Sequence, residues 1–158
     1  MHTPHYPAFF DDVPRLKLRD PLAAFLSAFQ DGLIEYSYLD AVKLAGHSCP
    51  TVASAYWMTH RALNVLYGDE IPERGAIRVD FREDRLEGVT GVIANVVSLL
   101  TGATSDTGFK GLAGRYDRRN LLFFNADIPC EIRFTRQDTG ASADALAHLR
   151  SVPADPEM

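Results

Sequence analysis

The stretch Ala45–Pro50 (AGHSCP), together with the segment that follows it, most strongly limits how this chain can fold. Its glycine permits a tight turn because glycine tolerates positive φ, and its proline suits the first position of a helix, where a missing N–H costs nothing. Apolar residues then recur at helical spacing over residues 51–67, which predicts a long helix. His47 and Cys49 are therefore expected in a loop that runs directly into a helix N-terminus.

This placement makes His47 and Cys49 candidates for both catalysis and metal binding. A helix N-terminus carries unpaired N–H groups and about +0.5 charge, so a thiol there loses its proton more easily than a free cysteine. Thiolate and imidazole are also ligands of zinc and of other divalent transition metals. A structural alternative explains the same string: a buried cysteine that packs as a small hydrophobe beside a capping histidine.

Two ligands do not complete a zinc site, which needs four protein ligands, or three with a water. Cys130, His5 and His2 are the candidates for the missing ligands, and both histidines lie in an N-terminal arm that can reach the site on its own chain or on a partner chain. His60 falls about three turns along the long helix, and we expect it to be structural. The two cysteines of the chain do not make a disulfide framework.

The remaining pattern predicts an α+β fold. Further helices are expected at residues 20–32, 38–45 and 142–150, and strands at residues 76–81, 120–125 and 130–136. The first of these helices is expected to bury Leu22, Phe25, Phe29 and Leu33. The length of residues 89–100 indicates a buried helix, although their β-branched content leaves a strand open. We expect one domain, with an arm at 1–14, a core at 15–151 built from a small, largely antiparallel sheet packed against several helices, and a frayed tail at 152–158.

Composition narrows the class of partner. The formal net charge of −5 and the pI near 5.5 argue against a nucleic acid or an anionic membrane as the main partner. No stretch of about 20 apolar residues could span a bilayer. The N-terminus lacks a basic region followed by an apolar run, so we expect no secretory signal and a cytoplasmic protein.

A second informative stretch, Thr101–Gly111, contains three glycines and four hydroxyl residues. Loops of this composition expose backbone N–H groups that can cradle an anionic or polar ligand. The stretch lacks the residue order of a P-loop. A long surface loop with no ligand explains the composition equally well.

Two segments together resemble the formylmethanofuran dehydrogenase E-subunit family. Leu44–Pro50 (LAGHSCP), followed by a long helix, resembles its H-G-H-x-C-P-G signature, and Leu100–Thr104 (LTGAT) resembles its L-T-G-C-T segment. The segments occur in the order and spacing of the family, and the resemblance covers residues 20–136. It implies an α+β core, commonly dimeric, with a metal or active site near the His-x-Cys segment.

The resemblance assigns candidate residues and also shows departures. It matches His47 and Cys49 to the signature, and it makes cofactor-binding candidates of Thr101, Gly102, Thr104 and Gly108. Ala45 and Ala103 stand where many members have a histidine and a cysteine, which argues against two-thiol redox chemistry. The cysteines of the C-terminal zinc finger that some members carry are absent from this sequence.

Three hypotheses follow from the sequence. The first is a metal-binding domain with zinc or another divalent transition metal on His47 and Cys49, which could serve a metal-dependent enzyme of unknown substrate. The second is metal-free thiol chemistry, with Cys49 as nucleophile and His47 as base. The third is a non-catalytic accessory protein that holds haem or a pterin-like molecule between the His47 loop and Thr101–Gly111. We expect a homodimer and a small-molecule ligand.

Overall fold

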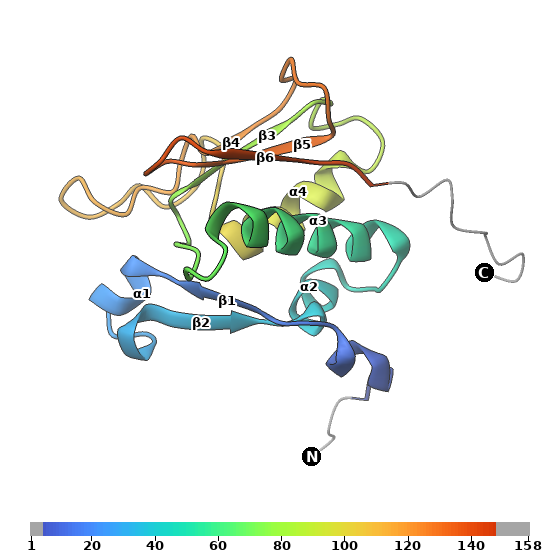
Figure 1. Cartoon of the computed structure of the whole chain (residues 1–158), viewed down its shortest axis with the longest axis horizontal. Helices are drawn as coiled ribbons and strands as arrows, with labels where there is room; N and C mark the ends of the chain where they lie inside the picture. The colour runs from blue at the N-terminus through green and yellow to red at the C-terminus, as the bar shows by residue number, and fades with distance from the viewer. Residues whose placement is uncertain (1–4, 148–158) are drawn as a thin grey trace, which may run out of the picture.

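The computed structural model describes residues 5–147, which form a mixed α+β fold (Figure 1). The helices are α1 (Pro21–Phe25), α2 (Tyr38–Ala45), α3 (Pro50–Tyr67) and α4 (Thr90–Thr101), with short 3-10 helices at Ala8–Asp12 and Gln30–Gly32. The strands are β1 (Leu16–Arg19), β2 (Leu33–Tyr36), β3 (Ile77–Phe81), β4 (Leu122–Phe123), β5 (Ile132–Arg136) and β6 (Ser142–Ala145). None of the described helices is long and apolar enough to cross a bilayer.

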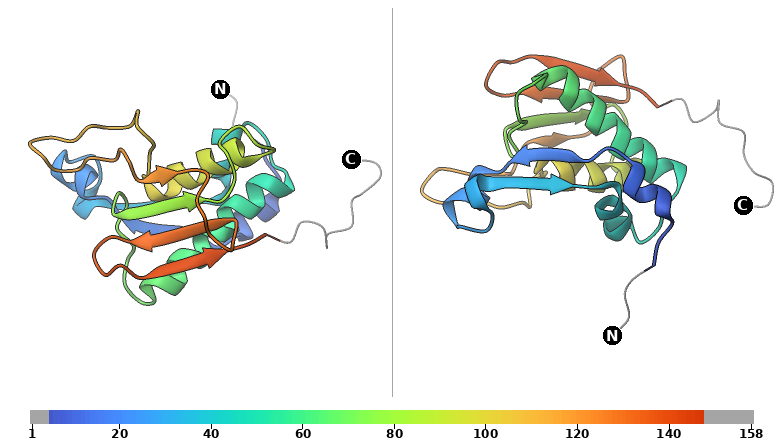
Figure 2. Two further views of the ribbon diagram at one scale, coloured as in Figure 1. Left: turned by 90° about the horizontal axis from the view of Figure 1, so that it is seen from above. Right: turned by 60° about the horizontal axis from the view of Figure 1, so that its bottom comes forward.

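The elements form three layers, with α3 and α4 between two sheets (Figures 1 and 2). One sheet is the antiparallel pair β1–β2, and the other has the order β4-β3-β5-β6. In the second sheet only β3 and β4 are parallel, so the expectation of a largely antiparallel sheet is confirmed. A helix layer covered on both sides can be apolar over most of its surface.

The core lies where α3 and α4 pack against each other and against the four-stranded sheet. Its fully buried side chains include Val52, Tyr56, Leu63, Val79, Val96, Val97, Leu100 and Phe134. The apolar segment before Gly102 is helix α4, 12 residues long, which confirms the helix expected at residues 89–100. Burial on two sides explains why its β-branched residues do not impose a strand.

The prediction of a helix over residues 20–32 is wrong after Phe25, where α1 ends. Asp20 caps α1 and a proline fills its first position, as expected, but the helix ends at Phe25. Asp31 has φ 57°, a left-handed conformation that a continuous α-helix does not contain, and the chain turns back there into β2. Phe25 and Phe29, expected on the buried face, are 59% and 50% exposed. The β1–β2 pairing takes precedence over the helical periodicity.

The helix expected at residues 142–150 is also wrong where the structure describes it. Ser142–Ala145 is strand β6, which pairs with β5 through a tight turn at Gly140, where φ is 78°. Ala143 lies opposite Phe134 and is buried, so its side chain alternates inward as a strand requires. Sheet pairing therefore overrides the helix propensity of the alanines. Residues 148–150 lie outside the described residues.

One buried ion network joins distant parts of the chain. The Asp20 carboxylate accepts a 2.6 Å hydrogen bond from Nη2 of Arg118 and a 2.9 Å bond from Nη1 of Arg74. Asp20 also caps α1, since its Oδ1 accepts the N–H groups of Leu22 and Ala23. Arg74 in turn donates to the carbonyl oxygen of Leu99 in α4. The start of α1, the approach to β3, the end of α4 and the approach to β4 thus share one contact.

We predict that Asp20→Asn destabilises the protein by about 3–5 kcal/mol, because it leaves two guanidinium groups without their buried anion. Urea denaturation at pH 7 measures the change. The matched control is Asp117→Asn, which breaks the exposed Asp117–Arg119 pair and should leave the unfolding midpoint almost unchanged. Equal destabilisation by the two variants would contradict the structural role of the network.

The same contact predicts a pH dependence. Burial favours a higher pKa for the Asp20 carboxyl, but hydrogen bonds from Arg118 and Arg74 and the Arg118 charge outweigh burial and hold that pKa below its ordinary value. A depressed folded-state pKa stabilises the protein fully above the unfolded pKa of about 3.9, and the contribution is lost as pH falls through the folded pKa. Lowering the pH below about 4 should therefore reduce the free energy of unfolding of the wild type more than that of Asp20→Asn. Urea denaturation of both proteins at a series of pH values measures the difference.

Candidate functional site

His47 and Cys49 lie in the short connection between α2 and α3, as the sequence predicts. A capping box between Ser37 and Asp40 fixes the start of α2, and Gly46 ends it in the left-handed conformation with φ 81°. Cys49 is the N-cap of α3 and a proline fills the first helical position. Helix signals on both sides therefore place the two candidate side chains within one turn of the α3 N-terminus.

Two hydrogen bonds hold this connection in place. The hydroxyl oxygens of Tyr38 and Ser48 lie 2.7 Å apart, which ties the loop to the buried start of α2. Nδ1 of His47 lies 3.1 Å from the carbonyl oxygen of Ala45, so the imidazole donates its Nδ1–H to the last residue of α2. His47 is exposed, and Cys49 is partly buried.

The two side chains change each other's protonation. The pKa of His47 is raised, first by its hydrogen bond to the Ala45 carbonyl and then by the neighbouring thiol of Cys49. Partial burial favours a higher pKa for the Cys49 thiol. However, the backbone N–H groups of Val52 and Thr51 and the His47 imidazole outweigh burial and lower that pKa. The arrangement thus favours a thiolate beside an imidazolium.

Cys49 opens into a small cavity of about 310 Å³ with aromatic and apolar walls. The lining residues are Phe9, Val13, Tyr38, Ser48, Cys49, Pro50, Ala53 and Trp57. Phe10 next to Phe9 packs edge-on against the Tyr38 ring with the ring centres 5.1 Å apart, which docks this part of the N-terminal arm against α2. The thiol therefore faces a site suited to an apolar small molecule.

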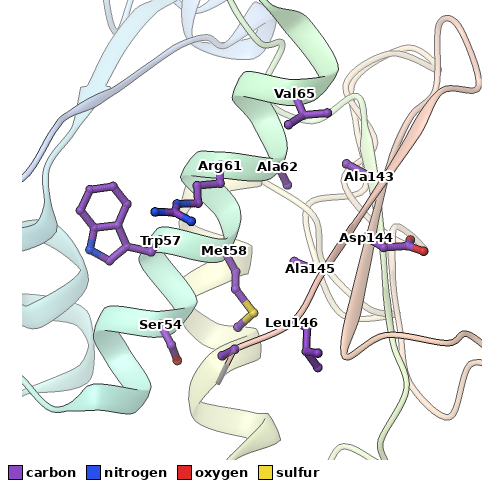
Figure 3. A pocket seen from close by; sticks show the side chains of 11 residues that line it. Ser54, Trp57, Met58, Arg61, Ala62, Val65, Ala143, Asp144, Ala145 and Leu146 are labelled. Atoms are coloured by element: carbon purple, nitrogen blue, oxygen red, sulfur yellow. The ribbon is translucent and has the colours of Figure 1, made fainter. Parts of the chain in front are cut away.

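A larger groove of about 750 Å³ lies between α3 and β6 (Figure 3). Met58, Ala62 and Val65 from α3 face Ala143–Ala147 across it, and Trp57 lies at its edge. Trp57 also lines the Cys49 cavity, and the Arg61 guanidinium lies 5.9 Å from the centre of its ring. Trp57 therefore borders both the Cys49 cavity and the groove between α3 and β6.

The other candidate metal ligands do not join the pair. Across residues 5–147, no group of three or more His, Cys, Asp and Glu side chains is arranged to hold a metal ion. Cys130 is buried two residues before β5, where its thiol donates to the Ile132 carbonyl at 3.3 Å and burial raises its pKa. His5 is exposed on the arm, and His2 lies outside the described residues. His60 is buried with its ring nitrogens 3.2 Å from the Arg15 carbonyl and from Asn64, which agrees with a structural role.

The glycine-rich stretch after α4 is mostly structural. Thr101 is fully buried and donates to the Val97 carbonyl, and the Thr104 hydroxyl donates to the Arg118 carbonyl at 2.6 Å. Gly108 packs so closely on Thr104 that a Cβ would overlap its side chain. Gly102 and Thr104 line a cavity of about 400 Å³ that neither His47 nor Cys49 lines. The structure therefore does not bring His47 and Cys49 together with the glycine-rich stretch around one cavity.

Sequence reasoning missed the charged residues of this second cavity. Arg74 and Arg118 line it, and Asp20 lies between their guanidinium groups. The pattern of residues 115–119 predicts a polar turn, and no spacing rule relates Arg118 to Asp20, which lies 98 positions earlier. Only the folded chain shows that this arginine is buried.

No family model matches this chain, and neither a curated protein nor a solved structure matches it significantly.

We predict that iodoacetamide alkylates Cys49 and leaves Cys130 unmodified in the folded protein. Cys49 is partly exposed with a lowered thiol pKa, whereas Cys130 is buried with a raised one. Peptide mass mapping after a short reaction at pH 7 measures the two sites separately. Unfolding in urea is the control, because both thiols should then react at similar rates. Modification of Cys130 at a comparable rate in the folded state would contradict the assignment.

Proposed function

We propose that Cys49 is a nucleophilic thiol, activated by His47, that reacts with a small apolar molecule carrying an electrophilic carbon. One observation carries the proposal: Cys49 caps the N-terminus of α3 next to His47, and it lines an aromatic cavity. The thiolate is the reactive form of cysteine, and a neighbouring cation together with a helix N-terminus increases its population at neutral pH.

The chemistry of such a site is the addition of sulfur to carbon. The Cys49 thiolate supplies the electron pair of the new S–C bond, and the electrons of a carbonyl double bond move to its oxygen. The imidazolium of His47 then gives a proton to that oxygen, which leaves a neutral adduct and a neutral imidazole. The hydrogen bond from His47 to the Ala45 carbonyl holds the ring in place during this transfer.

The cavity supports an apolar reactant. Phe9, Tyr38 and Trp57 provide ring surfaces beside the sulfur, and Val13 and Ala53 complete the apolar wall. A volume of about 310 Å³ lies at the lower end of the range of about 300–1,000 Å³ typical of small-molecule sites. A reactant longer than this cavity would extend past Trp57 toward the groove between α3 and β6.

A second candidate function is binding of zinc or another divalent transition metal by His47 and Cys49. The favouring observation is the bond from Nδ1 of His47 to the Ala45 carbonyl, since metal-binding histidines commonly donate their other ring N–H to such an acceptor. The pair is exposed enough for a partner copy to contribute ligands, in line with the dimer and the metal site that the resemblance to the formylmethanofuran dehydrogenase E-subunit family implies. Two ligands from one chain do not suffice.

The pH dependence of alkylation tests the thiol proposal. In the wild type, the midpoint of the rate profile should lie below the ordinary cysteine pKa of about 8.5. His47→Ala should move this midpoint upward and lower the rate at pH 7 by roughly two- to tenfold, because one pKa unit changes the thiolate fraction about tenfold. The matched control is His5→Ala, an exposed histidine outside the Cys49 cavity. An unchanged profile in His47→Ala would overturn the proposal.

Zinc titration distinguishes the second candidate. The protein is equilibrated with a zinc salt and desalted, and the bound metal and the oligomeric state are measured for the wild type and Cys49→Ser. Stoichiometric zinc in a dimeric wild type, lost in Cys49→Ser, would establish metal binding. A wild-type protein that retains no zinc and has a reactive Cys49 thiol would support the proposal of a nucleophile and would overturn the proposal of a metal site.

A further inference from the structure

We propose that the cavity lined by Gly102, Thr104, the buried Arg118 and the half-buried Arg74 binds an organic monocarboxylate with an apolar tail. The cavity of about 400 Å³ is bounded by α1, α2, α4 and the segment between α4 and β4. Its lining residues do not include Cys49 or His47, so this site is independent of the thiol chemistry proposed above.

The charge of the cavity wall favours a ligand with a single negative charge. Arg74 and Arg118 are two cations, and Asp20 is the one anion between them, which leaves a surplus of one positive charge. Among the described residues, Arg74 and Arg118 are the charged side chains that line the cavity, and Asp20 contacts both of them without lining it. Arg118 is 5% exposed and Asp20 4% exposed, so water screens little of this surplus. A monocarboxylate would balance it, whereas a phosphate dianion would exceed it.

Arg118 has hydrogen-bonding capacity that the protein leaves unused. Its Nη2 donates to Asp20, but within residues 5–147 neither its Nε nor its Nη1 donates to an acceptor. Among the described residues no buried side-chain nitrogen lacks a hydrogen-bond partner, so these two donors are open to solvent. An incoming carboxylate would replace water as their acceptor and form a charge-assisted hydrogen bond with the guanidinium. The guanidinium lines the cavity, which places those donors within reach of a ligand.

Two glycines lie directly against this guanidinium. A Cβ at Gly75 would lie 2.6 Å from Cζ of Arg118, and a Cβ at Gly102 would overlap Nη1. The N–H of Gly75 donates to the Thr101 carbonyl at 2.8 Å, so the backbone on both sides of the arginine is itself fixed. Close backbone contact holds the cation in one position before any ligand arrives, which lowers the entropic cost of binding.

The rest of the cavity suits an apolar tail. Leu22, Leu44, Leu99 and Phe109 line it, and Leu44 and Phe109 are among the large hydrophobic side chains exposed on the surface. Asn95 and Ser98 add polar groups on the α4 side. An anionic head at Arg118 and an aliphatic chain against these four side chains would satisfy both halves of the site.

Octanoate serves as the ligand in the test, followed by ¹H–¹⁵N NMR of the full chain. Octanoate should give saturable shifts at the amides of Gly102 and Thr104 and at the Nε–H of Arg118. Octanol, which has the same tail without the charge, and acetate, which has the head alone, should each bind about tenfold more weakly or worse. Equal affinity for octanol, or tighter binding of inorganic phosphate, would overturn the proposal.

Two matched variants locate the site. Ser98→Trp fills the cavity while keeping Asp20, Arg74 and Arg118, and it should abolish octanoate binding. Ser54→Trp places the same bulk in the groove between α3 and β6 and should leave binding unchanged. Loss of binding in Ser54→Trp with retention in Ser98→Trp would assign octanoate to the groove and overturn the proposal. Amide spectra of both variants without ligand show that the fold is intact.

Discussion

The contact of the buried Asp20 carboxylate with the guanidinium groups of Arg118 and Arg74 is the interaction on which most of the arrangement depends. It joins segments that are far apart in sequence: the start of α1, the approach to β3 and the approach to β4. A buried ion pair contributes little net free energy compared with apolar packing, but removing one partner leaves an uncompensated charge. The network therefore specifies how the β1–β2 layer meets the helices rather than supplying most of the stability, which comes from the apolar surfaces of α3, α4 and the larger sheet.

The position of α2 follows from this layering and explains why the molecule has two separate cavities around it. Tyr38 at the start of α2 lines the Cys49 cavity, and Leu44 near its end lines the arginine cavity. One cavity is aromatic and borders a nucleophile, while the other carries surplus positive charge and borders aliphatic side chains. A ligand suited to one is unsuited to the other, so the two cavities that border this short helix favour different chemistry.

Sequence reasoning succeeded where local signals act alone. The Gly46 turn, the Pro50 helix start and the α3 periodicity are local, and they placed His47 and Cys49 correctly. It failed at residues 26–32, which form the turn that lets β2 pair with β1, and at residues 142–145, which pair with β5 as a strand. Arg118 could not be found from the sequence, because an arginine between charged neighbours is typical of a solvated turn, and only the tertiary contact with Asp20 buries it.

The segment Leu100–Thr104, which carries part of the resemblance to the family, lies beside the cavity that Arg118 lines. The segment that resembles a cysteine-containing motif of the family has Ala103 in this chain, and Ala103 is fully buried. The neighbouring Gly102 instead leaves room for the Arg118 guanidinium, which a side chain at that position would displace. At the end of α4 this chain therefore has the guanidinium of Arg118, held close to the backbone, and no thiol. The accessible thiol lies at the start of α3, so the anion recognition and the attack by sulfur that we propose would be independent of each other.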